Sequence, residues 1–127
     1  MASILKVDTI TGVTTAGSIA ITGEGNSTTT NLQQGLTKAF IIAESDATDI
    51  GSFNISGTTD NGTGDYTYNL TNNMNDNKAV VNANCSQNND AVAYNNSRAT
   101  DDYHIKLEEN GSAVDRRVSS AAHGDLA

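Results

Sequence analysis

Residues 52–71, SFNISGTTDNGTGDYTYNLT, contain two segments in which apolar and polar side chains alternate. The apolar members of these alternations are Phe53, Ile55, Tyr66, Tyr68 and Leu70. Because successive side chains of a strand point to opposite faces of a sheet, each segment places its apolar side chains on one face. Residues 57–64 contain an Asn-Gly pair and closely spaced glycines, which favour a tight connection between the segments. The stretch therefore predicts two strands folded back over a core.

The longer run SFNISGTTDNGTGDYTYNLTNNMND, at residues 52–76, resembles a small β-sandwich domain found in tail fibres and related virion appendages of marine bacteriophages. Residues 12–40, GVTTAGSIAITGEGNSTTTNLQQGLTKAF, resemble the stalk that precedes that domain. Residues 105–127, IKLEENGSAVDRRVSSAAHGDLA, are similar to its closing strands. The chain departs from the family pattern at residues 119–123, where Ser, Ala and His replace larger apolar residues.

The resemblance implies a bacteriophage virion structural protein without enzymatic activity, located in the virion and assembled in the host cytoplasm. It also implies a homotrimer that forms a short tail-fibre-like appendage, with phage tail or capsid proteins as partners. A decoration protein of the capsid surface is the alternative position on the particle. A module that recognises host surface glycans is the competing functional class.

The composition indicates one compact domain with a thin core. The 127 residues suffice for a single domain and an extended arm, and only 24 of them are Leu, Ile, Val or Phe. Asn and Thr, with 16 residues each, favour turns and exposed strands. A chain with so little apolar material is expected to complete its core by association with other chains.

The charge distribution argues against two classes of partner. The net charge is −8 and the largest basic cluster is the pair Arg116 and Arg117, so we expect no nucleic-acid binding. No apolar run approaches the length of a membrane span, and the segment MASILKVDTI lacks the features of a secretory signal. The single cysteine, Cys85, excludes an intrachain disulfide and is expected to be a small core residue.

Residues 1–29 are predicted to form an N-terminal attachment arm. Their apolar side chains are too sparsely spaced to bury one another and are expected to dock on a partner. These attachment residues are Leu5, Val7, Ile10, Val13, Ile19 and Ile21. A disordered tail is the alternative interpretation of this segment.

Residues 30–50 are predicted to form a short helix and a linker. Thr30 and Asn31 are good helix N-caps, and the helix is expected to extend to residue 42. Leu32, Leu36 and Phe40 then share one face and are the predicted trimer contacts. The same face could pack on the chain's own sheets instead of on a three-fold axis.

Residues 51–127 are predicted to form an antiparallel β-sandwich, so that the fold is mainly β. The expected strands after residue 71 are 79–85, 91–94, 103–108 and 113–122, the last pair joined by a hairpin turn at Asn110-Gly111. Val81, Ala83 and Cys85 share one face of the first of these strands. Tyr103, Ile105 and Leu107 give the clearest half-buried pattern.

The sequence contains no catalytic constellation, and no cofactor or metal site is predicted. His104 and His123 are expected at surface or interface positions, although His104 with Asp101 and Asp102 could in principle bind a metal. Residues 60–65 resemble part of a calcium loop, but a loop that starts at Asp60 would have Thr71 at its twelfth position, where a glutamate is required. We therefore assign residues 60–65 to turn formation. If glycans are bound, the expected elements are the loops at 72–77 and 95–102, with Tyr94 or Tyr103.

Overall fold

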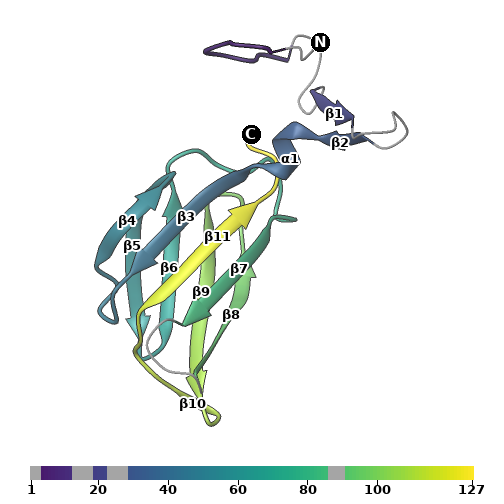
Figure 1. Ribbon diagram of the computed structural model, residues 1–127. Helices are drawn as coiled ribbons and strands as arrows, with labels where there is room; N and C mark the ends of the chain where they lie inside the picture. Colours follow the sequence, from purple (N-terminus) through teal and green to yellow (C-terminus); the bar gives the residue numbers. More distant parts are fainter. Residues whose placement is uncertain (1–3, 13–18, 23–28, 86–90) are drawn as a thin grey trace.

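The computed structural model describes residues 4–12, 19–22, 29–85 and 91–127. These residues form two antiparallel sheets, a two-stranded ribbon and one short helical turn (Figure 1). The ribbon consists of β1 (Ala20–Thr22) and β2 (Thr29–Asn31), and the helical turn α1 (Leu32–Gly35) follows it directly. The prediction of a mainly β fold with antiparallel sheets is confirmed.

The first sheet has four strands in the order β4-β3-β11-β7. Their bounds are β3 (Thr37–Ala43), β4 (Asp49–Phe53), β7 (Val80–Cys85) and β11 (Val118–His123). The central pair joins distant parts of the sequence, because β11 lies against β3 from Val118 opposite Ala43 to His123 opposite Thr37. The predicted strand at 79–85 is therefore confirmed, and it forms one edge of this sheet.

The second sheet has five strands, with β9 paired to β6, β8 and β10, and β6 paired to β5. Their bounds are β5 (Ile55–Gly62), β6 (Asp65–Leu70), β8 (Ala91–Arg98), β9 (Asp102–Glu109) and β10 (Ser112–Ala113). We call the two sheets together, residues 37–123, the two-sheet body. In Figure 1 the four-stranded sheet lies in front of the five-stranded one.

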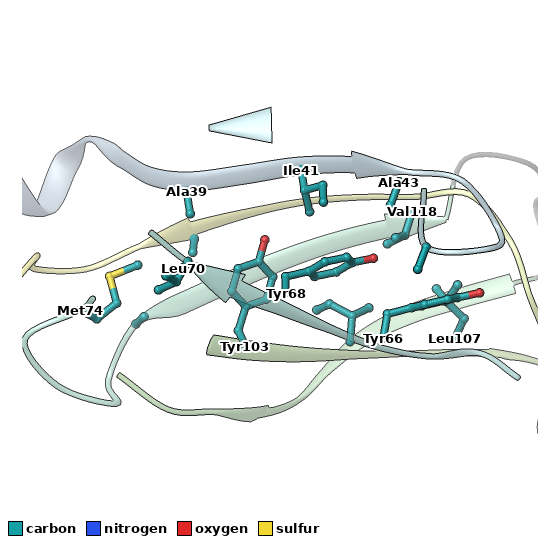
Figure 2. Close-up of a cluster of buried hydrophobic side chains, with 14 residues drawn as sticks. Ala39, Ile41, Ala43, Tyr66, Tyr68, Leu70, Met74, Tyr103, Leu107 and Val118 are labelled. Carbon is teal, nitrogen blue, oxygen red and sulfur yellow. The ribbon is translucent and has the colours of Figure 1, made fainter. Parts of the chain in front are cut away.

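The core lies between the two sheets, and its side chains come from the inward positions of both (Figure 2). The five-stranded sheet contributes Tyr66, Tyr68, Leu70, Tyr103, Ile105 and Leu107. The four-stranded sheet contributes Ala39, Ile41, Ala43, Val118 and Ala122. The predicted alternations at 66–70 and 103–107 are thus confirmed. Three of the five core residues of the four-stranded sheet are alanines, and they lie across the core from a sheet that contributes three tyrosines. Residues 119–123, where the chain departs from the family pattern, form a central strand all the same.

The predicted helix over 30–42 is wrong beyond Gly35. Residues 37–43 form strand β3, in which Ala39, Ile41 and Ala43 point into the core and Phe40 and Ile42 point outward. β-branched residues and alternate burial favour a strand here, and tertiary pairing with β11 decides it. The body therefore begins at residue 37, before the predicted domain boundary at residue 51.

Asn54 is the point at which the chain passes from one sheet to the other. It adopts a left-handed conformation, with φ of 59°, between the end of β4 and the start of β5. Its side-chain amide donates to the Lys38 and Asn72 carbonyls, both at 3.0 Å, and its oxygen accepts from the Asn72 amide at 2.7 Å. The prediction that Phe53 and Ile55 share a buried face is therefore wrong, because they belong to different sheets and Phe53 is exposed.

The hairpin after β9 turns at Asn110-Gly111 as predicted, but the returning strand is short. Only Ser112 and Ala113 pair with β9, and the chain then crosses to the other sheet as β11. Asp115 anchors this crossing, since its Oδ1 accepts the Gly64 amide at 2.7 Å and the Tyr66 hydroxyl at 3.1 Å. The predicted strand at 113–122 is thus corrected to two separate strands.

Candidate functional site

Most of the described apolar side chains of the N-terminal arm are exposed to solvent. Leu5 is 78% exposed, and Val7, Ile10 and Ile21 are each more than half exposed. Ile19 is partly buried, and its carbonyl accepts the Leu32 amide at 2.8 Å. Val13 lies outside the described residues. The predicted attachment residues that are described thus form an apolar arm ahead of the two-sheet body.

The three predicted trimer contacts do not form one helical face. Leu32 lies in α1, where it is partly buried, and Leu36 follows the helix and is exposed. Phe40 lies in β3 and points away from the core. The spacing that placed them together holds only for a helix, and the backbone is extended from residue 37 onward.

Phe40 instead belongs to an apolar surface on the outside of the four-stranded sheet. Phe40 pairs in register with Phe53 of β4, and their rings stack with centroids 6.2 Å apart and planes 25° apart. Phe40, Ile42, Phe53 and Val80 are between 41% and 57% exposed. We call these four side chains, with Ala121 between them on β11, the outer apolar face.

Most residues that border the outer apolar face on β11 and β7 are polar and uncharged, whereas beside Val80 the residues Asp76, Lys78 and Asp125 line a hollow. Ser119 of β11 lies between Ile42 of β3 and Asn84 of β7, and Ala121 lies between Phe40 and Asn82. These positions alternate with buried ones on β11 and with half-buried ones on β7, so they point outward. The surface is thus an apolar centre bordered by hydroxyl and amide groups along β11 and β7, with charged residues beside Val80.

The outside of the five-stranded sheet is different, because its side chains form a hydrogen-bonded polar cluster. His104 of β9 contacts Asp65 of β6 through Nε2, and Asn61 lies within hydrogen-bond distance of both. The Lys106 ammonium is 3.5 Å from the other Asp65 oxygen. On the neighbouring strand β8, the Tyr94 hydroxyl donates a hydrogen bond to the Glu108 carboxylate of β9 at 2.6 Å. We call these side chains the outer polar face.

The electrostatics of the outer polar face favour the ionised form of Asp65. Burial alone would raise the pKa of its carboxyl group, but hydrogen bonds from His104 and Asn61 and the positive charges of His104 and Lys106 outweigh burial and lower the pKa. The hydrogen bond to Glu108 raises the pKa of the Tyr94 hydroxyl. The face therefore holds a fixed negative charge within a network of matched donors.

The residues predicted as candidates for metal or glycan binding lie in different environments in the structure. His104 contacts Asp65, and the described residues contain no group of three or more His, Cys, Asp or Glu side chains arranged to hold a metal ion. Tyr103 is 2% exposed and belongs to the core, so the expectation that it contacts a glycan is wrong. Tyr94 is partly exposed and lies on the outer polar face. Cys85 is half-buried and packs against the core, as predicted.

His123 lines an open hollow of about 450 Å³ near the end of the chain. Its other lining residues are Asp76, Lys78, Val80, Gly124 and Asp125. Lys78 forms an ion pair with Asp76 at 2.6 Å, and both side chains are largely in solvent. The hollow is a shallow polar feature at the margin of the outer apolar face.

Sequence reasoning placed Phe40 among the contact residues but missed Ile42, Phe53 and Val80. The signal for β3 was present in the run AFIIA at residues 39–43, where apolar residues continue without a polar alternate. Such a run is typical of a strand that is covered on both faces. In a single copy of this chain, only the inner face of β3 is covered by the core.

Comparisons of the chain with protein-family models, with curated proteins and with solved structures found no match. In the part of the chain that the structure describes, no helix has the length and apolarity needed to cross a bilayer. The fold and surfaces define a two-sheet β protein with an apolar N-terminal arm, one apolar outer face and one polar outer face.

Proposed function

We propose that this chain is a non-enzymatic structural protein of a bacteriophage virion. It forms a short trimeric appendage of the tail-fibre type, which its N-terminal arm anchors to a tail or capsid protein of the particle. The resemblance of residues 52–76 to the virion appendage family supports the phage assignment. The observation that carries the attachment role is the arm itself, which exposes large apolar side chains ahead of a folded body.

The exposed arm supplies a physical mechanism for attachment. Full burial of one large aliphatic side chain contributes about 1.5–3 kcal/mol, and Leu5, Val7, Ile10 and Ile21 are 78%, 53%, 56% and 53% exposed, so burial of their exposed parts contributes roughly 4–7 kcal/mol in total. Ordering the backbone of the arm costs about 1–2 kcal/mol per residue and offsets much of this gain. One arm therefore binds weakly, whereas three arms on one trimer raise the effective concentration of the second and third.

The attachment role predicts that polar substitutions in the arm remove the protein from virions. Leu5→Ser combined with Ile10→Ser, introduced into the phage gene, should leave a folded protein that is lost from purified particles. Val92→Ser is the matched control, because Val92 is an equally exposed aliphatic residue on β8, outside the arm. Quantitative mass spectrometry of purified virions measures the copies per particle. Undiminished incorporation of the arm variant would refute the attachment role.

The capsid-decoration alternative differs in copy number. A tail appendage is present in a few trimers per particle, whereas a decoration protein follows the many repeated sites of the capsid surface. The copies of wild-type protein per virion, measured in the same experiment, decide between the two positions.

Host-glycan recognition is a second candidate function, and the outer polar face favours it. Tyr94 offers a partly exposed ring beside Glu108, and amide and carboxylate side chains of the kind that bind sugar hydroxyls lie on the same sheet. A glycan array probed with the purified protein tests this function. Binding that is lost in Tyr94→Ala and retained in Val80→Ala, an exposed valine of the other sheet, supports it, and the absence of any signal removes it.

A further inference from the structure

We propose that the outer apolar face of the four-stranded sheet is the surface through which copies of this chain contact one another. This inference deepens the proposed function, since it rests on the self-association that a trimeric appendage requires. The occupant of the face is a second copy of the chain, and the central contact is the stacked pair Phe40 and Phe53.

The first argument is the pattern of strand β3. Ala39, Ile41 and Ala43 are fully buried against the core, while Phe40 and Ile42 on the opposite face are each 41% exposed. A strand that is apolar on both faces is stable in water when both faces are covered. Aromatic side chains dominate the energetics of interfaces when they are buried there, and here two of them form one stacked unit in solvent.

The second argument is the charge of the chain. Each copy has a net charge of −8, so two copies repel least where they meet through a surface with few acidic groups. The strands of the four-stranded sheet contain a single acidic residue, Asp49, at the start of the edge strand β4. The strands of the five-stranded sheet contain Asp60, Asp65, Asp102, Glu108 and Glu109. The apolar face is therefore the sheet surface on which like copies can approach.

The third argument is the border of the face. Ser119, Asn82 and Asn84 border the apolar centre on the side of β11 and β7 and carry both hydrogen-bond donors and acceptors. A second copy presents the same groups, and amides and hydroxyls can pair with their own kind, whereas carboxylates cannot. An apolar aromatic centre with a polar rim is the anatomy of a protein interface that is depleted of charge at its core.

The test is light scattering of the purified full-length protein across a range of concentrations. The wild type should be oligomeric, and Ile42→Lys should lower its association constant by about 30-fold or more, the loss that a hot-spot residue produces. Val92→Lys is the matched control, because it places the same charge at an exposed β-branched position on the other sheet. It should leave the oligomer unchanged.

A second variant separates loss of contact from loss of folding. Phe53→Lys lies on the edge strand β4, where the side chain is 54% exposed, and it should dissociate the oligomer with the circular dichroism spectrum of the wild type. A monomeric wild type, or folded Ile42→Lys and Phe53→Lys proteins with the wild-type mass, would overturn the inference. The arm variant tests the proposed function separately, because it should remain oligomeric while it is lost from virions.

Discussion

Gly64 provides the sharpest test of how the two sheets are joined. It lies between β5 and β6 with φ of 65°, and its amide donates to Asp115 Oδ1 at 2.7 Å. Its carbonyl accepts the Leu107 amide at 2.8 Å. A Cβ atom at this position would lie 2.5 Å from the Leu107 carbonyl oxygen and 2.8 Å from that of Val114. Both obstacles are backbone atoms, so no side-chain rotation can relieve the overlap.

The expected cost of Gly64→Ala follows from two terms. The left-handed conformation costs a residue with a Cβ atom about 1–2 kcal/mol, and the overlap adds about 1–3 kcal/mol, as for an overpacked core. We therefore expect a loss of roughly 2–5 kcal/mol in the free energy of unfolding. Gly111→Ala is the matched control, because Gly111 also has a positive φ, of 78°, but nothing lies within 4 Å of its added Cβ. Its cost should be about 1–2 kcal/mol.

Urea denaturation followed by circular dichroism measures both variants at one protein concentration. With a urea m-value of about 2 kcal/mol/M, the midpoint of Gly64→Ala should fall by roughly 1–2.5 M. The midpoint should fall clearly less in Gly111→Ala. If the two variants lose equal stability, the close approach of Gly64 to β9 and to residue 114 is refuted.

Two further predictions concern buried and charged side chains. Tyr103→Phe should cost about 1–2 kcal/mol in urea denaturation, because it leaves the buried Ser120 hydroxyl without its partner at 3.0 Å. Tyr68→Phe should leave the free energy of unfolding unchanged or raise it slightly, because the buried Tyr68 hydroxyl has no hydrogen-bond partner among the described residues. Equal losses of stability in the two variants would contradict this. The lowered pKa of Asp65 means that its ionised form stabilises the fold fully above pH of about 4 and that this contribution is lost as the pH falls through the lowered value. Asp65→Asn should therefore weaken the decline of unfolding free energy between pH 6 and pH 2, and an unchanged pH dependence would contradict the pairing with His104.

The sequence predicted the half of the core in which apolar and polar residues alternate. Tyr66 and Tyr68 on β6, and Ile105 and Leu107 on β9, show period-two patterns, and strands with such patterns bury one face. The turn at Asn110-Gly111 was predictable for a local reason, since both residues adopt positive φ, which this pair tolerates. These features depend on neighbours in the sequence.

The features that could not be predicted depend on contacts between distant segments. Asn54 separates two strands because its side chain bonds Lys38 and Asn72, and neither partner is near it in the sequence. Phe40 fits a helical spacing with Leu36 as well as a strand, and pairing with β11 decides in favour of the strand. Tertiary structure overrides local preference at both positions.

The polar and apolar outer faces were invisible in the sequence for a related reason. His104 meets Asp65 because the register of β6 and β9 places Thr67 opposite His104 and Asp65 opposite Lys106. Phe53 meets Phe40 through the register of β3 and β4. A shift of one residue in either register would send these side chains to the other face of the sheet.

The pairing of β3 with β11 also has a consequence for synthesis on the ribosome. Strand β3 is translated early, yet its central partner spans Val118–His123 and emerges after nearly all of the remaining body. Strand β3 can pair early with β4, which follows it directly, but it must remain without its central partner while most of the body is still being made. Because such long-range pairing closes slowly, we expect nascent chains that stop short of residue 118 to depend on chaperones and proteases.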